Sequence, residues 1–280
     1  MRAIGVYSDW SASNFFWQHR VSFGALFFAF VSLDLIVTTL RTRAPASTTA
    51  VIVNASIWLG ELVIRRGSFA LRLGLFAMLA VRAPMHIAVS IPTVVVAYLA
   101  VDFIYYWKHR FYHQTRIGWA LHTTHHSSRS ITALAAIRLS WFEAALDYLF
   151  FLPLALLGFE PLLLFALIEA NGAYQFWLHT EMVGRLRWLD PWLNTPHNHR
   201  RHHSVDVRES ASNYGSTLMI WDHLFGTYRT GESHRGPYGV EGIRESINPL
   251  YLQFAGLMRL RKRRDPASNP SSEGKPTAPR

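Results

Sequence analysis

The chain has 280 residues, of which 50% are hydrophobic and 16% are charged, a composition that favours an integral membrane protein over a soluble one. Its 28 Lys and Arg exceed its 18 Asp and Glu, and the long apolar runs indicate that the acidic partner is a lipid surface and not nucleic acid. The sequence contains no cysteine, which excludes disulfides, thiolate catalysis, iron–sulfur clusters and cysteine-rich zinc sites. Any bound metal must therefore use histidine, carboxylate or amide ligands.

Three apolar segments come before the first group of histidines. Residues 1–20 lack the continuous apolar core of a cleaved signal peptide, so we expect insertion to depend on internal spans. Residues 21–40 are long enough to cross a hydrocarbon layer of roughly 30 Å. A second segment runs from about residue 50 to 64, with a continuation to Leu79 left open, and a third from about residue 87 to 107. We expect these segments to form membrane-spanning helices.

Residues 141–178 hold two further apolar stretches, separated by Gly158-Phe159-Glu160-Pro161. Glycine and proline around a single acid are typical of a turn, so this segment predicts a helical hairpin. Both ends of a hairpin lie at the same membrane face, and histidines on either side of it can therefore meet. Arginine and lysine are concentrated at those ends, whereas the turn offers only Glu160, so the positive-inside rule places the histidines on the cytosolic side.

The end of the chain has a different composition. From Arg259 it becomes strongly basic, and from Pro266 it contains no apolar residue larger than alanine. Such a segment cannot bury enough apolar surface to fold. We expect one membrane-integral domain over residues 1–260 and a disordered polar tail over residues 261–280.

Nine of the 14 histidines form four groups next to these spans. The four groups are His109 and His113; His122, His125 and His126; His179; and His199, His202 and His203. Spacings of three and four residues put helical side chains on one face. We therefore expect His125 and His202, each three residues beyond another histidine, to share a metal with that neighbour. The adjacent His126 and His203 point about a quarter-turn away and are able to serve a second metal. Nine imidazoles exceed the ligands of one zinc site, so the pattern predicts two metals, which imidazole alone does not identify.

The other five histidines lack this spacing, and we expect them not to bind metal: His19, His86, His197, His223 and His234.

The motifs YYWKHRFYH, LHTTHHSS, QFWLHT, NTPHNHRRHHS, SNYG and WDHLFGTY, in this order and at this spacing, resemble the fatty acid hydroxylase/sterol desaturase superfamily. Its bacterial members and the animal alkylglycerol monooxygenases are most similar, and the resemblance covers roughly residues 102–228. It implies an all-α fold with about four transmembrane helices, the hairpin among them, and a cytosolic histidine-rich cap. It also implies a membrane-bound non-haem di-iron oxygenase that uses O2 and external electrons to hydroxylate or desaturate a fatty acyl, sterol-like or ether lipid. Zinc is able to replace the two iron ions in purified protein.

Carried over residue by residue, the resemblance makes metal ligands of the same nine histidines. Gln175 stands where some relatives have a further histidine, so that a water or its amide oxygen is able to take that place. Asn213, Tyr214, Trp221 and Asp222 match positions that surround the ligands and fix histidine tautomers through hydrogen bonds.

The electrons must come from elsewhere, because the chain has neither a nucleotide-binding glycine motif nor cysteine. A reductase, a cytochrome, a ferredoxin or a reduced pterin would serve as donor. Two other classes stay open. A metal-ion transporter would need ligands at mid-membrane depth, for which Asp34, Asp102 and Glu169 are the candidates. A zinc hydrolase would need a glutamate directly after the first of two paired histidines, where this chain has Arg110.

Overall fold

The structure is a computed structural model that describes residues 29–40, 48–231 and 236–262. The chain divides into two compact units, residues 1–46 and residues 47–280. The described part of the first unit is the apolar helix Ala29–Leu40, and the start of the expected span at residues 21–28 lies outside the described residues. The described residues form helices and two isolated β-bridges with no strand, which confirms the all-α prediction. The single domain over residues 1–260 stays a prediction.

The second unit begins with two helices, α2 (Thr48–Gly67) and α3 (Phe69–Val81). Ser68, which is not helical, separates them. Among the described helices, α2 alone is long and apolar enough to cross a membrane by length and composition. A bundle of four spans therefore stays a proposal.

Helix α4 (Ile91–Gln114) is longer than the predicted third span, because it continues through the first pair of histidines. Its start is fixed by a capping box, in which the Ser90 side chain accepts from the Thr93 amide and Thr93 accepts from the Ser90 amide. Thr115 then ends α4 with extended backbone and caps α5 (Arg116–His126). The turn is tight, since a Cβ at Gly118 would lie 2.5 Å from the carbonyl oxygen of Phe111. This bend directs the histidines of α4 and α5 toward one another.

The predicted hairpin differs from expectation in its first arm. That arm is divided into α7 (Trp141–Leu146), a 3-10 turn η1 (Asp147–Phe151) and α8 (Leu152–Leu156), preceded by the short α6 (Ala133–Ala136). Asp147, which accepts hydrogen bonds from Lys108 (2.7 Å) and from the Tyr112 hydroxyl, lies at the break. Pro153 also lacks the amide that a continuous helix would need there. The second arm is one helix, α9 (Pro161–Phe176), capped by Glu160.

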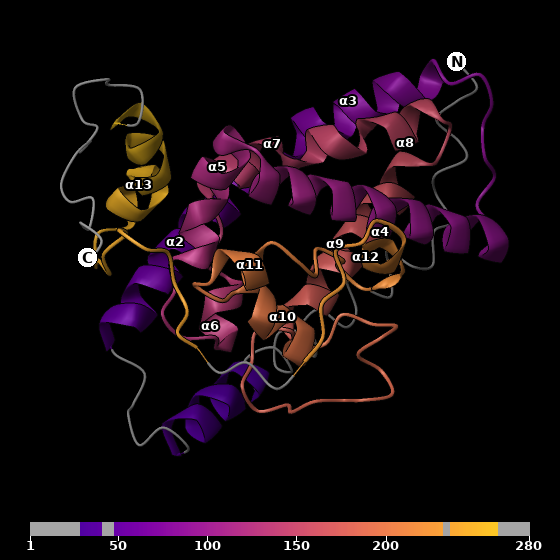
Figure 1. Cartoon of the computed structure of the whole chain (residues 1–280). Coiled ribbons are helices and arrows are strands. Elements are labelled where there is room, and N and C mark those ends of the chain that lie inside the picture. The colour runs from indigo at the N-terminus through magenta and orange to yellow at the C-terminus, as the bar shows by residue number, and fades with distance from the viewer. Residues whose placement is uncertain (1–28, 41–47, 232–235, 263–280) are drawn as a thin grey trace, which may run out of the picture. The chain divides into compact units, whose positions relative to one another are not determined.

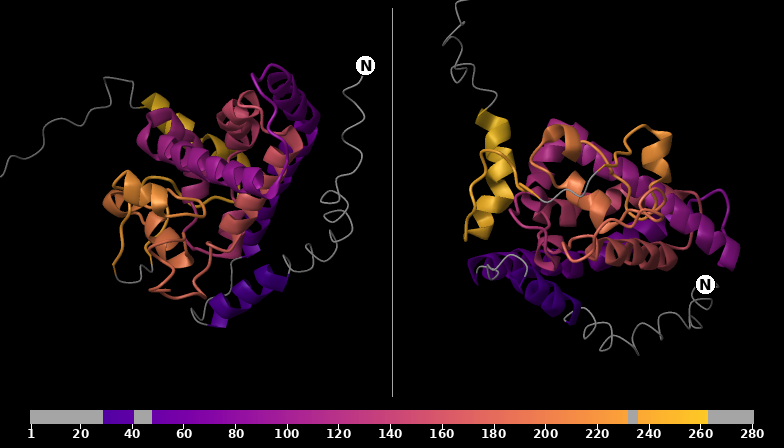
Figure 2. Two further views of the ribbon diagram at one scale, coloured as in Figure 1. Left: turned by 90° about the vertical axis from the view of Figure 1, so that its right-hand side faces the viewer. Right: turned by 60° about the horizontal axis from the view of Figure 1, so that its bottom comes forward.

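The remaining elements form a cap of short helices and one longer C-terminal helix: α10 (Pro196–His202), α11 (Val207–Ser210), α12 (Ile220–Leu224) and α13 (Pro249–Lys262). Within this unit α4 runs between α3 and α8 on one side and α10, α11 and α12 on the other (Figures 1 and 2). The expected tail at residues 261–280 lies, from residue 263 on, outside the described residues.

Asp102 joins α4 to the cap. Its carboxylate accepts from the amides of Thr217 (2.9 Å) and Leu218 (3.2 Å) and from the indole of Trp221 (2.9 Å). All of these are structural hydrogen bonds, which explain a fully buried acid without a transported ion.

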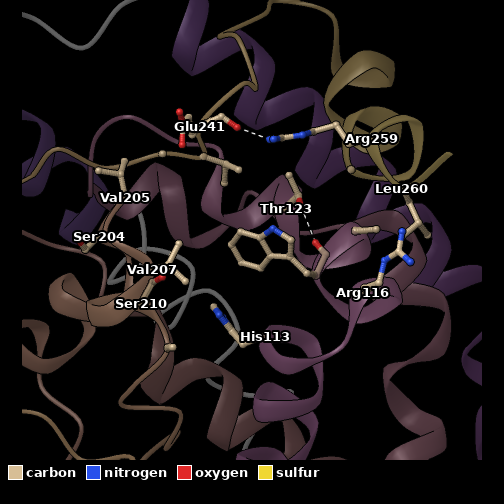
Figure 3. Close-up of a pocket in the computed structure, with 16 residues that line it drawn as sticks. His113, Arg116, Thr123, Ser204, Val205, Val207, Ser210, Glu241, Arg259 and Leu260 are labelled. Carbon is tan, nitrogen blue, oxygen red and sulfur yellow. Dashed lines mark hydrogen bonds between the residues drawn. The ribbon is translucent and has the colours of Figure 1, made fainter. Parts of the chain in front are cut away.

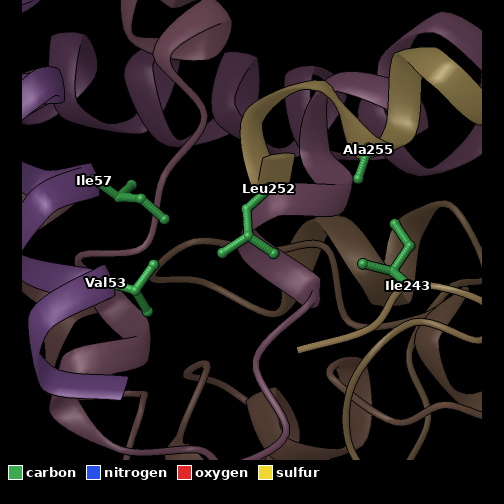
Figure 4. Close-up of a cluster of buried hydrophobic side chains, with 5 residues drawn as sticks. All are labelled: Val53, Ile57, Ile243, Leu252 and Ala255. Carbon is green, nitrogen blue, oxygen red and sulfur yellow. The ribbon is translucent and has the colours of Figure 1, made fainter. Parts of the chain in front are cut away.

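A small hydrophobic core fixes α13 to α2. Val53 and Ile57 of α2 pack against Leu252 and Ala255 of α13, and Ile243 completes the cluster (Figure 4). This contact holds the C-terminal helix beside the histidine-bearing helix α5, against which it also packs.

Candidate functional site

The structure brings all nine predicted histidines together in two groups. The first group contains two residues of α4, two of α5 and one of α10, and the ligand atoms that they offer lie within 4.8 Å of one another: His109, His113, His122, His126 and His202. Four of the five are buried, and His113 is partly exposed. No acid belongs to this group.

The second group contains four buried histidines, His125, His179, His199 and His203. Their Nε2 atoms face one another, at 3.2 Å between His179 and His125, 2.9 Å between His199 and His179, and 3.1 Å between His203 and His199. The hairpin makes this possible, because His125 precedes it in the chain and His179 follows it.

Adjacent histidines enter different groups, while those four residues apart enter the same one. His122 pairs with His126, and His199 with His203, so the expectation that His125 and His202 share a group with a histidine three residues earlier is wrong. The reason is helix geometry. At 3.6 residues per turn, a residue four positions on deviates by about 40° from its partner and one three positions on by about 60°.

The second ring nitrogen of several histidines donates a hydrogen bond to a fixed oxygen. His109 Nδ1 lies 3.0 Å from the Tyr214 carbonyl oxygen, His202 Nδ1 2.8 Å from that of Ser212, and His179 Nδ1 3.1 Å from that of Gln175. A carbonyl oxygen only accepts, so Nδ1 carries the proton and Nε2 keeps its lone pair. These contacts orient the rings as ligating histidines are oriented in metalloproteins.

The Nε2 atoms themselves have no satisfactory protein partner. Those of His113, His122, His126 and His202 are buried and make no hydrogen bond within the described residues. In the second group, Nδ1 of His125 and Nδ1 of His179 face the carbonyl oxygens of Arg138 and Gln175. The Nε2 lone pairs of these two rings therefore face each other at 3.2 Å, which is repulsive unless a cation lies between them. A metal about 2.1 Å from each nitrogen places neighbouring ligands about 3 Å apart when they meet at right angles. Both groups therefore fit a metal ion.

Burial also suits these rings to metal binding. Burial, together with repulsion from His202 and other neighbouring imidazoles, lowers the pKa of His113 well below its usual value. Burial lowers the pKa of His179 and of His202 to about 4. The imidazoles are therefore neutral at pH 7, which is the form that binds a cation.

Of the four residues that the sequence predicted to surround the ligands, Asn213, Tyr214 and Asp222 do so, and each makes a different contact. Asp222 accepts from the amides of Tyr214 (2.8 Å) and Gly215 (2.7 Å), and so holds the carbonyl that orients His109. Asn213, at a φ of 55°, accepts from the Arg229 amide and donates to the Asn198 carbonyl oxygen, linking its loop to α10. Trp221 instead donates to Asp102, and it makes no hydrogen bond to a candidate ligand among the described residues.

Gln175 contributes through its main chain. Its carbonyl oxygen orients His179, while its side-chain amide donates to Asn171 at 2.9 Å. Its place in α9, one turn before His179, explains both contacts.

Sequence reasoning missed Glu143, whose two carboxylate oxygens each lie 3.1 Å from His122 Nδ1. Glu143 is buried in the first arm of the hairpin. Glu143 and Asp147 are the two acids of this apolar arm, and an acid within an apolar stretch is a signal that could have found Glu143, since such residues are costly to bury without a partner. Arg200 of α10 also contributes, as a fully buried side chain. It donates at 2.8 Å to the carbonyl oxygens of Thr180 and Val183, and so fixes the loop that follows His179.

The remaining described histidines lie outside both groups. His86 is exposed, His197 is fully buried, and His223 donates to the Pro191 carbonyl oxygen at 2.9 Å. His19 and His234 lie outside the described residues.

Two groups of imidazoles, held on α4, α5 and α10 and directly after the helical hairpin, define a histidine-box protein, and residues 94–227 match the family model of the fatty acid hydroxylases. This region is a fatty acid hydroxylase domain, which confirms the resemblance to the fatty acid hydroxylase/sterol desaturase superfamily. It contains all nine histidines.

Several known proteins are similar to part of this chain. The chain is 39% identical over 165 residues to human alkylglycerol monooxygenase, covering 59% of this chain and 36% of the relative, and 43% identical over 144 residues to the enzyme of Danio rerio, covering 51% and 32%. It is 36% identical over 140 residues to the ornithine lipid hydroxylase OlsE of Rhizobium tropici, covering 48% and 41%. The chain thus spans about a third to two fifths of the length of these relatives. No solved structure shows a significant match.

Proposed function

We propose that this protein is a membrane-bound non-haem di-iron oxygenase that hydroxylates or desaturates a lipid. The observation that carries the proposal is the division of nine neutral imidazoles, eight of them buried, into two groups whose ligand atoms converge. The names of the relatives, which describe monooxygenation and hydroxylation of lipids, support the reaction class.

The nine histidines would hold two iron ions, one in each group. When bound, the iron pair would supply the activation of O2 and the oxidation of an unactivated C–H bond. The protein's own task is positioning and exclusion of water. The carbonyl oxygens of Tyr214, Ser212 and Gln175 each hold one histidine ring in a single tautomer. The cap covers the histidines and limits the access of bulk water to them.

Exposed apolar side chains support a location in the membrane. Large hydrophobic residues are exposed along α2, α3 and α4, including Leu59 (57%), Val81 (78%) and Ile91 (84%). Soluble monomers rarely expose apolar surface on this scale. We therefore propose a multi-pass protein, with about four spans and with the histidines on the cytosolic side.

The electrons would come from a separate donor, a reductase, a cytochrome, a ferredoxin or a reduced pterin, and the lipid from the bilayer. Arg116, Arg129, Arg185 and Arg187, which are exposed and lie near the histidines in the sequence, would suit an acidic electron carrier.

The two alternatives have less support. A transporter would use Asp102, but the structural hydrogen bonds described above occupy that carboxylate. A zinc hydrolase would need a glutamate directly after the first of two paired histidines, and Arg110 stands at that position after His109.

The test is lipid oxidation by full-length protein in lipid nanodiscs, supplied with ferrous iron, a chemical reductant and a bacterial lipid extract. We expect mass spectrometry to show a gain of one oxygen atom, carrying the isotope of labelled O2, or a loss of two hydrogens. Product formed in the absence of O2, or about one metal ion or fewer in active protein, would refute the proposal.

A further inference from the structure

A cavity of about 380 Å³ lies beside the first group of histidines (Figure 3). Its walls come from α5, from α11 with the residues around it, and from α13. Apolar groups dominate among them, including Trp119, Val205, Val240 and Leu260. This volume lies in the range of small-molecule pockets. It suits one alkyl chain and is too small for a whole bilayer lipid.

The cavity reaches the candidate metal centre through two rings. His113, the partly exposed member of the first group, lines it. Trp119 also lines it, and its ring centroid lies 5.2 Å from that of His113 and 5.3 Å from that of His126. A molecule in the cavity therefore contacts the histidine group directly, without any rearrangement of the cap.

The charged residues at the cavity favour a ligand with a negative charge. Arg116 of α5 and Arg259 of α13 lie on one side, across from Val205 and Val207 (Figure 3). One acid, Glu241, also lines the cavity, and its main-chain carbonyl oxygen accepts from Arg259. The two guanidinium groups exceed this single carboxylate, so the net charge at the cavity is positive. Arginine pairs bind carboxylate and phosphate groups with particular strength.

We propose that this cavity binds a single-chain amphiphile with an anionic headgroup, with the headgroup between Arg116 and Arg259 and the alkyl chain along Trp119 toward His113. The identification of this ligand as the substrate rests on the proposed function. Part of the wall, Gly239 to Glu241 and the residues of α13, lies outside the matched family region. The C-terminal segment would therefore add to the selectivity that Arg116 and Trp119 of the histidine domain provide.

The absence of cysteine provides a direct binding assay. In the variant Ala211→Cys, a single thiol lies at an exposed position of the cavity wall, and the parent chain serves as the blank. The rate of maleimide labelling is measured on full-length protein in neutral detergent with decanoate, decyl phosphate or decyltrimethylammonium, which share one alkyl chain. Protection by either anion supports the proposal, and the anion that protects at the lower concentration identifies the headgroup. Equal protection by the cation overturns it.

The arginines are tested in the same labelled background. Arg116→Gln combined with Arg259→Gln should raise the anion concentration needed for half protection roughly a hundredfold, about tenfold for each charge-assisted contact. Arg116→Gln alone, at an exposed residue, should give about a tenfold change and covers the case in which the double variant fails to fold. Arg208→Gln is the matched control, since this nearby exposed arginine does not line the cavity. An equal effect of Arg208→Gln, or none in the other two variants, overturns the proposal.

The assay separates this inference from the proposed function, because labelling needs no metal, O2 or turnover. Protection without lipid oxidation would refute the oxygenase and leave the cavity assignment standing. Lipid oxidation without protection would refute the cavity assignment alone.

Discussion

Nδ1 of His122 lies at the same distance, 3.1 Å, from both carboxylate oxygens of Glu143. A shared contact of this kind fixes the ring plane and leaves Nε2 free for a metal. We expect Glu143→Gln to lower iron affinity or lipid oxidation about 10- to 100-fold, because an amide offers one acceptor where the carboxylate offers two. Metal analysis and product formation measure the effect. Glu169→Gln, at an exposed glutamate of α9, is the control, and an equal loss there would contradict the assignment.

Asp222 acts on His109 through the main chain of Tyr214. Replacing it by asparagine leaves one of the buried amides of Tyr214 or Gly215 poorly paired, and we expect a loss of roughly 1–3 kcal/mol in the free energy of unfolding. Iron should also dissociate more readily from the first group. Asp206→Asn provides the comparison, since exposed Asp206 also accepts from a main-chain amide in the cap, that of Arg208, at 2.9 Å. Comparable destabilisation by the two variants would exclude a particular role for Asp222.

His126 and His203 stack at 4.2 Å between ring centroids but belong to different groups. We expect His126→Ala and His203→Ala each to remove about one metal ion per chain while retaining the other, since each variant keeps one group complete. Plasma mass spectrometry of protein purified with iron measures this. His86→Ala, at an exposed histidine outside both groups, should retain both ions. Loss of both ions in every variant would instead indicate a single shared site.

Helix α13 packs very closely on α5 at Gly256, where an added Cβ would lie 2.1 Å from the Ala120 carbonyl oxygen. We expect Gly256→Ala to push α13 away and lower stability by about 1–3 kcal/mol, as overpacking does. The cavity should widen, so labelling of Ala211→Cys should accelerate. Gly172→Ala in α9 is matched, because nothing lies near its added Cβ, and it should be neutral or stabilise the helix by up to about 1 kcal/mol.

The hairpin can be tested by labelling intact cells with an impermeant maleimide. Arg129→Cys and Arg187→Cys, both exposed, should react only after the cell membrane is opened. Leu157→Cys, at the exposed turn between the two arms, should report the opposite side. Arg129→Cys and Arg187→Cys on opposite sides would refute both the hairpin and the shared cytosolic face.

The sequence allowed the meeting of the histidines to be predicted, because helical spacing and the turn at Gly158 are local signals. Their assignment to groups was predicted wrongly, because the two spacings were treated as equal although residues four apart align more closely on a helix than residues three apart. The carbonyl oxygens of Ser212 and Tyr214 were inaccessible, because main-chain acceptors have no residue signature, whereas Glu143 could have been found as an acid within an apolar stretch. The broken first arm depends on Asp147 bonding to residues of α4, a tertiary contact that apolar content does not reveal.

Because α5 supplies His122 and His126 to one group and His125 to the other, the spacing between the two groups is set within a single helical turn. Helix α10 repeats the arrangement with His202 and its neighbours. Bending of the surrounding helices by changes in bilayer thickness can therefore move both groups together but cannot separate them without unwinding a helix. The distance between two bound ions should accordingly be insensitive to the lipid in which the protein is reconstituted.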